Sequence, residues 1–178
     1  MSDPRDTGQT HAPQRAPQIE VREVRRGRML SLPVDMTGSV GWISHSTGTV
    51  DFLLVQPGRV VVRPAGPAHN EGDIGRFAGK VAANRAGQTS ATLTLPWEVV
   101  FFLFGPRIYA AMKSHQRWVD NKTRNSPSAQ GAEPEWPADA VLIAFAAGEA
   151  LEFWNHAFAE AEIPDRLKLA TAEPDDAA

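Results

Sequence analysis

The residues with the clearest chemical potential are four arginines near the start of the chain: Arg22, Arg25, Arg26 and Arg28. Guanidinium groups bind phosphate oxygens and the O6 and N7 edge of guanine, and a two-stranded β-ribbon fits the major groove of duplex DNA. Alternation along a straight strand would place Arg26 and Arg28 on one face and Arg25 on the other. The pattern favours contact with duplex DNA, and it is equally typical of a solvated edge strand whose charges deter aggregation.

Charge is distributed unevenly along the chain. Residues 1–132 hold 16 Lys and Arg against 10 Asp and Glu, a balance of +6, whereas residues 133–178 hold 2 against 11, a balance of −9. A basic body can bind a polyanion, and an acidic terminal segment can bind a basic partner. Solvated surfaces would show the same division, so charge alone leaves a polyanionic partner as a hypothesis.

Large apolar side chains recur near helical spacing in the last third of the chain. They are Phe145, Leu151, Trp154 and Phe158. Alanine and leucine are plentiful around them, which favours a C-terminal helix over residues 138–163. Because part of this helix would be apolar on more than one side, we expect it to pack against a protein partner or a second copy of the chain.

The strand and helix patterns around these residues predict an α+β fold. In this fold a small β-rich core of hairpins is followed by one or two C-terminal helices. Residues 1–18 are polar and rich in proline, which predicts a disordered arm. Residues 19–122 form the β-rich core domain, with an amphipathic helix near 106–119. A polar linker at 123–137, the helix at 138–163 and an acidic tail at 164–178 complete the chain.

The core domain contains one clear hairpin signal and one ambiguity. Residues 49–55 and 59–64 have the pattern of strands, and the Gln-Pro-Gly sequence at 56–58 places Pro and Gly where a type II turn favours them. Residues 97–104 are almost wholly apolar. Their periodicity fits either a buried strand or the first turns of a helix that follows Pro96.

Two blocks of the core domain share a pattern. Residues 27–33 read Gly-Arg-Met-Leu-Ser-Leu-Pro, and residues 87–96 run from Gly-Gln to Thr-Leu-Pro. Each block has a basic approach, a glycine turn, a strand and a Leu-Pro stop. In this pattern the chain resembles the swapped-hairpin DNA-binding proteins of the AbrB, MazE and MraZ type, over about residues 19–104. The resemblance implies two swapped-hairpin-like units, an obligate homo-oligomer and a role in transcription regulation.

The resemblance also implies a second set of DNA contacts, from Lys80 and Arg85 in the second unit. The chain departs from the family pattern in its spacing. Between Gly27 and Pro33 there is one residue more than the usual unit has, and the second block has three more still. A one-residue change in a strand turns the following side chains to the opposite face, so the spacing decides which side chains face DNA.

Catalytic and metal-binding patterns are weak by comparison. The five histidines lack His-x-His and His-x-x-x-His spacing. Glu149, Glu152 and His156 could share one helical face, which suits a metal only with ligands from a second helix and otherwise fits an ordinary polar stripe. The Ser-His-Ser sequence at 44–46 lacks a nucleophile elbow. We therefore expect no enzyme activity, no metal and no cofactor.

Composition is typical of a soluble protein. Cysteine is absent, which excludes disulfides and thiolate chemistry. The first residues lack the apolar stretch of a signal peptide, and the longest apolar runs are far shorter than the ~20 residues of a spanning helix. We expect a cytoplasmic protein without a membrane partner. Two functions are in competition: an oligomeric transcriptional regulator on duplex DNA, and a non-enzymatic adaptor that docks a protein partner through the C-terminal helix.

Overall fold

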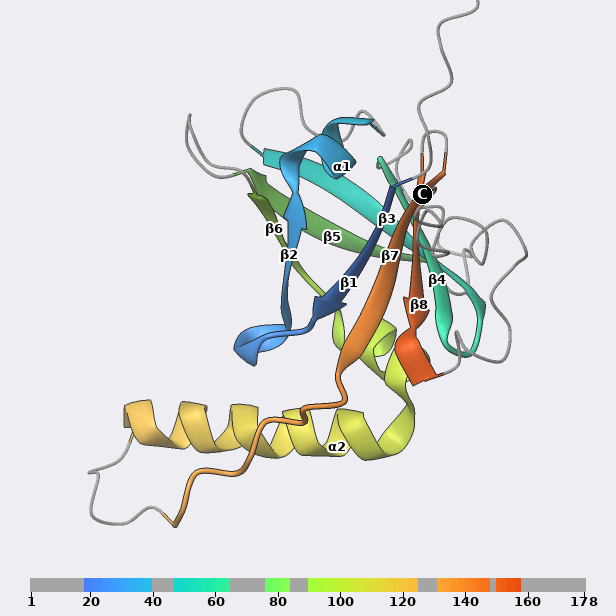
Figure 1. Cartoon of the computed structure of the whole chain (residues 1–178). Helices are drawn as coiled ribbons and strands as arrows, with labels where there is room; N and C mark the ends of the chain where they lie inside the picture. Colours follow the sequence, from blue (N-terminus) through green and yellow to red (C-terminus); the bar gives the residue numbers. More distant parts are fainter. Residues whose placement is uncertain are drawn as a thin grey trace, which may run out of the picture.

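The fold combines one large sheet with one long helix. The computed structural model describes residues 18–39, 47–64, 76–83, 90–124, 131–147 and 150–157. Its elements in chain order are β1 (Gln18–Glu23), η1 (Arg26–Arg28), β2 (Met29–Pro33), α1 (Val34–Ser39), β3 (Thr47–Gln56), β4 (Arg59–Pro64), β5 (Arg76–Ala83), β6 (Ser90–Thr94), α2 (Trp97–Arg124), β7 (Val141–Ala147) and β8 (Ala150–Asn155). The predicted α+β class is confirmed (Figure 1).

The described strands form a single antiparallel sheet. Their order is β1-β7-β8-β4-β3-β5-β6-β2, so β1 and β2 lie at its two edges although η1 joins them in sequence. A local bridge spans η1, where the backbone amide of Arg25 donates to Met29 at 2.8 Å and that of Met29 donates back at 3.2 Å. The sheet therefore curves around an enclosed core, as Figure 1 shows.

The predicted hairpin is confirmed. Strands β3 and β4 pair antiparallel, and Gln56 faces Arg59 across the turn. Gly58 has φ 85°, the left-handed conformation that the third residue of a type II turn needs. The backbone of Gly58 donates to Phe102 at 2.9 Å and accepts from Asn155 at 2.8 Å. The turn is thereby anchored to both α2 and β8.

The core lies on the concave side of the sheet. Buried and less buried residues alternate along β2, β4 and β6, as expected for strands with one face on the core. The largest fully buried side chains come from the sheet, from α1, from α2 and from the segment between β6 and α2: Leu30, Leu32, Met36, Phe52, Leu93, Leu95, Leu103, Met112, Leu142, Leu151 and Phe153. Helix α2 therefore contributes to the same core that the sheet encloses.

Residues 97–104, for which the sequence left strand and helix open, are helical. They form the first arm of α2. Gly105 interrupts the helix with φ 75° and ψ −177°, and Pro106 follows it. The second arm of α2, residues 106–124, contains the helix predicted near 106–119. The kink lies at this pair, because Gly105 leaves the helical region of φ and ψ and the following proline cannot donate a helical hydrogen bond.

The predicted helix at 138–163 is wrong over its described part, because Val141–Ala147 and Ala150–Asn155 are strands. Strand β7 pairs with β1 and β8, and β8 also pairs with β4. Apolar side chains on both faces of a short run fit a doubly covered strand as well as a helix. Pairing on both sides of β7 outweighs the high helix propensity of alanine, because propensity differences are less than about 1 kcal/mol per residue.

The predicted polar linker at 123–137 overlaps the end of α2 and an extended segment along it. Trp118 donates its indole N–H to the carbonyl of Gly131 at 3.0 Å, and Trp136 donates to Val24 at 2.8 Å. The predicted arm at 1–18, except for Gln18, and the tail at 164–178 lie outside the described residues. None of the described helices has the length and apolar character needed to cross a membrane.

The two similar sequence blocks form similar elements. Strand β2 is followed directly by α1, and β6 by Leu95, Pro96 and α2. The two strands pair antiparallel, with Leu30 opposite Leu93. Each block thus contains a strand and a helix that begins after the Leu-Pro pair, and the family resemblance itself stays a prediction.

Candidate functional site

The four arginines near the start of the chain do not form one outward-facing cluster. Arg22 on β1 makes a salt bridge with Glu20 at 2.9 Å. Arg26 on η1 makes one with Glu133 at 2.8 Å. Three of the four guanidinium groups, including that of Arg28, are engaged with groups of their own chain. Such groups would have to exchange these partners for phosphate before they could bind DNA.

Arg28 is the most firmly held of the four. It donates to the backbone carbonyl of Leu95 at 2.7 Å, and its guanidinium lies 4.5 Å from the ring centroid of Trp97. Burial lowers the pKa of Arg28, and the nearby Glu98 carboxylate acts in the opposite direction. Arg28 therefore fastens η1 to the start of α2.

The remaining predicted DNA contacts are Arg25, Lys80 and Arg85. Arg25 is exposed, immediately before η1. Lys80 lies on β5, opposite Thr49 of β3, and β6 separates β5 from the β2 edge of the sheet. Arg85 lies outside the described residues. Arg22 and Arg25 line one shallow pocket beside β1, and no described contact joins them to Lys80; duplex-DNA binding stays a prediction.

Three of the four residues predicted to dock a partner, Phe145, Leu151 and Trp154, are buried within the chain. Leu151 belongs to the main core, whereas Phe145 and Trp154 form a second cluster with Ile143, against which Ile19 packs. The period of two in β7 and β8 explains the division, because neighbouring side chains of a strand point to opposite faces. Phe158 lies outside the described residues. The four residues therefore do not form one exposed helix face.

A cluster of polar side chains holds the second arm of α2 against segment 131–140. His115 is buried and its Nε2 lies 3.0 Å from a carboxylate oxygen of Glu133, which also contacts Arg26. The hydrogen bond with His115 lowers the pKa of Glu133, and the positive charge of Arg26 adds to this effect. Indole rings of Trp118 and Trp136 flank the imidazole. This arrangement is typical of a structural tether.

The described residue set shows no group of three or more His, Asp or Glu side chains that could hold a metal ion. Glu152, one of the residues considered for a metal, lies on β8 and makes a salt bridge with Arg59 at 3.1 Å. The same carboxylate accepts a hydrogen bond from the indole of Trp154 at 3.2 Å. Glu152 therefore binds Arg59 and Trp154 of its own chain, on the face of β8 that points away from the main core.

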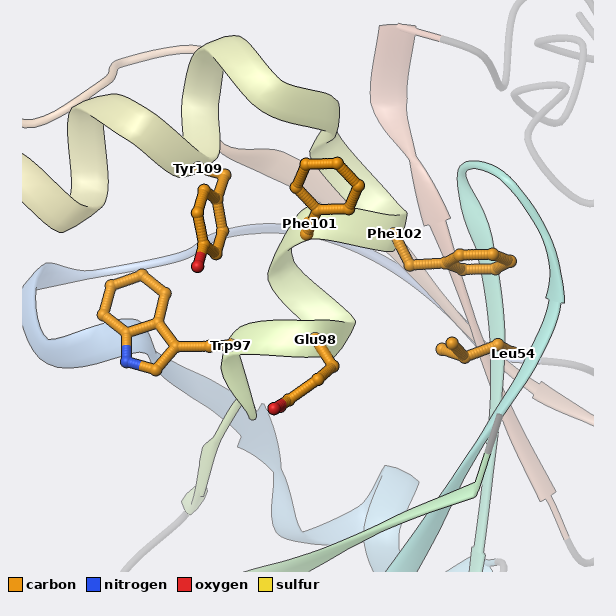
Figure 2. A pocket seen from close by; sticks show the side chains of 6 residues that line it. All are labelled: Leu54, Trp97, Glu98, Phe101, Phe102 and Tyr109. Carbon is orange, nitrogen blue, oxygen red and sulfur yellow. The ribbon is translucent and has the colours of Figure 1, made fainter. Parts of the chain in front are cut away.

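The most promising site is an aromatic groove at the kink of α2 (Figure 2). We use this name for a pocket of about 400 Å³ lined by Leu54, Trp97, Glu98, Phe101, Phe102 and Tyr109. Leu54 comes from β3 and the other five residues from α2. Four of the six lining side chains are aromatic, and the side chain of Glu98 is the only charged one among the described residues of this lining.

The kink creates the groove. Trp97 and Phe101 are four residues apart, so they share one face of the first arm. The change of direction at Gly105 brings Tyr109 of the second arm back toward both rings. The Tyr109 ring lies edge-to-face with Trp97 at a centroid distance of 5.5 Å and with Phe101 at 5.3 Å. A straight helix would not place these three rings together.

The wall of the groove is held in place by cations of its own chain. The ammonium of Lys113 lies 4.1 Å from the ring centroid of Trp97 and 5.5 Å from that of Tyr109. The guanidinium of Arg28 also contacts Trp97. Cation–π contacts of this kind contribute about 0.5–1 kcal/mol each at exposed sites. The Trp97 ring is therefore fixed before any ligand arrives.

Sequence reasoning missed this groove. The signal was present, because Trp97, Phe101 and Tyr109 recur at multiples of four residues. It could be used only if residues 97–104 were known to be helical and the effect of Gly105 on the path of the chain were known. No family model, curated protein or solved structure matches this chain, so the site rests on its own geometry.

Proposed function

We propose that the protein is a non-enzymatic binding protein that holds an apolar ligand in the aromatic groove of α2. The proposal rests on the solvent exposure of Phe101, a large apolar residue that lines the groove and is 49% exposed. Ligand pockets are typically concave and mostly apolar, with a few polar groups that orient the ligand. The groove has this composition, with four rings, one leucine and one carboxylate.

Rigidity supports a binding role. Rings that are already fixed lose little conformational entropy when a ligand binds, and association is correspondingly more favourable. Trp97 contacts Arg28, Lys113 and Tyr109, and Phe101 is packed against Tyr109. The lining rings offer contact area rather than a reactive nucleophile, which favours binding over catalysis as the role of this site.

Titration with a neutral, polarity-sensitive dye such as Nile red tests the proposal. We expect saturable binding to the wild-type protein and about fivefold weaker binding to Phe101→Ala, because half of a phenylalanine side chain contributes roughly 1 kcal/mol when it is buried. Val21→Ala is the matched control, since Val21 is also an exposed apolar residue but lies on β1, outside the groove lining. Equal affinity of wild type and Phe101→Ala, with both folded, would refute the proposal.

The two functions predicted from the sequence, docking of a partner protein and binding of duplex DNA, are not part of this proposal. Docking through a C-terminal helix loses its structural basis, because the described part of that segment is β7 and β8. Duplex-DNA binding by an oligomer remains a separate prediction. It does not enter this proposal, because Arg22, Arg26 and Arg28 are engaged within the chain.

A further inference from the structure

We propose that the ligand of the aromatic groove is a small organic cation with an apolar body, and that Glu98 selects its charge. This inference rests on the proposed function and adds the chemical class of the ligand. Glu98 is exposed at the start of α2 and lines the groove, and Figure 2 shows its side chain at the rim between Trp97 and Leu54, across the groove from the Phe101 and Tyr109 rings. A carboxylate next to several aromatic rings is the combination that recognises ammonium groups.

The rings of the groove already bind cations in the free protein. Trp97 contacts both the Lys113 ammonium and the Arg28 guanidinium, and Tyr109 contacts Lys113 as well. Neither cation lines the groove itself. Their contacts show that these ring faces attract positive charge, and Glu98, whose carboxylate also acts on Arg28, supplies the negative charge of the lining.

An anionic ligand is the alternative that the neighbouring charges raise. Arg28 and Lys113 would attract an anion, but Arg28 donates to the Leu95 carbonyl and both cations are stacked on rings. An anion in the groove would instead lie beside the Glu98 carboxylate without a described cation in the lining. The charge of the lining therefore favours a cation.

The size of the site favours a small molecule over a protein partner. A volume of about 400 Å³ lies at the lower end of the range for ligand pockets, roughly 300–1,000 Å³. Stable protein interfaces bury about 800 Å² on each partner. Of the exposed large apolar side chains in the described regions, Phe101 alone lines the groove. The apolar surface is thus too limited for a partner protein to dock on it.

Competition experiments with three ligands of similar shape test the inference. Benzyltrimethylammonium carries a permanent positive charge, neopentylbenzene is its neutral carbon isostere, and benzylsulfonate is an anion of comparable size. Each is titrated against the dye-loaded wild-type protein. We expect the cation to displace the dye at about tenfold lower concentration than the neutral isostere, with the anion weakest.

Two variants assign the preference to Glu98. Glu98→Gln removes the charge and keeps the shape, so we expect cation affinity to fall about three- to tenfold, with the neutral isostere unchanged. Glu135→Gln is the control, because Glu135 is an exposed carboxylate outside the groove lining. Thermal unfolding of each variant shows whether the fold is retained, and unchanged affinity for the neutral isostere shows that the groove is intact.

The possible outcomes separate this inference from the proposed function. Dye binding without a preference for the cation, or a preference that survives in Glu98→Gln, overturns the inference and leaves the binding role standing. Stronger displacement by the anion also overturns it. If a lysine-containing apolar peptide binds and benzyltrimethylammonium does not, the assignment to a small molecule is wrong. Absence of dye binding to the wild type overturns both proposals.

Discussion

Replacement of Gly105 by alanine is the most direct test of how the groove is built. Gly105 has φ 75° and ψ −177°, a backbone region that is essentially restricted to glycine. A Cβ added at this position meets no atom within 4 Å, so steric clashes with neighbouring groups do not contribute to the destabilisation. The backbone conformation alone should destabilise Gly105→Ala, by about 1–3 kcal/mol.

Thermal and urea unfolding measure this loss. For a chain of 178 residues, 1–3 kcal/mol corresponds to a fall in Tm of roughly 2–12 °C. Gly131→Ala is the matched control, because a Cβ there also meets no atom within 4 Å and its φ lies outside the positive range. We expect Gly131→Ala to unfold like the wild type. The same dye titration as above should show weaker binding to Gly105→Ala, since the strain is relieved by moving one arm of α2.

Substitution of Gly105 by D-alanine provides a second test of whether the backbone conformation at this position determines the kink. The mirror image of φ 75°, ψ −177° is ordinary extended backbone. A semisynthetic protein with D-alanine at this position should therefore recover both stability and dye binding. If L-alanine is tolerated as well as D-alanine, the kink does not depend on the conformation of Gly105, and the account of the groove given above is wrong.

Three further predictions concern residues outside the groove. The pKa of Glu133 is lowered by His115, so its contribution to stability is present above the ordinary value of 4.5 and is lost as the pH falls below it; Glu133→Gln should flatten this acid limb in pH-dependent unfolding curves. Trp154→Ala should lower the free energy of unfolding by about 3–5 kcal/mol, because the side chain is buried; dissociation of an oligomer with unchanged stability, seen by size-exclusion chromatography, would contradict this. If the protein binds duplex DNA, Arg25→Ala should weaken a salt-sensitive mobility shift, whereas Arg28→Ala should mainly lower Tm.

Local sequence signals predicted much of the fold. The hairpin of β3 and β4 could be predicted because Pro57 and Gly58 satisfy a turn whose conformation depends on those two residue types. The helix near 106–119 could be predicted from its apolar spacing. Both signals are local, so they do not require knowledge of distant contacts.

Non-local pairing explains what the sequence could not reveal. Strands β7 and β8 contain alanine, leucine and glutamate, which favour a helix in isolation. Their conformation is determined by pairing with β1 and β4, which lie more than 80 residues away in the chain. Phe145, Leu151 and Trp154, which were predicted to form a docking face, are consequently parts of two buried clusters.

Contacts with residues distant in the sequence also explain the role of the basic segment at 22–28, which first suggested a nucleic-acid partner. In the folded chain, Arg28 joins η1 to Leu95 and Trp97, and Arg26 joins η1 to Glu133. Each of these contacts supports an element that forms or holds α2. A loss of DNA binding in Arg28→Ala would therefore be ambiguous, since that change also disturbs the wall of the groove. Arg25, which is exposed, is the arginine whose replacement separates the two functions.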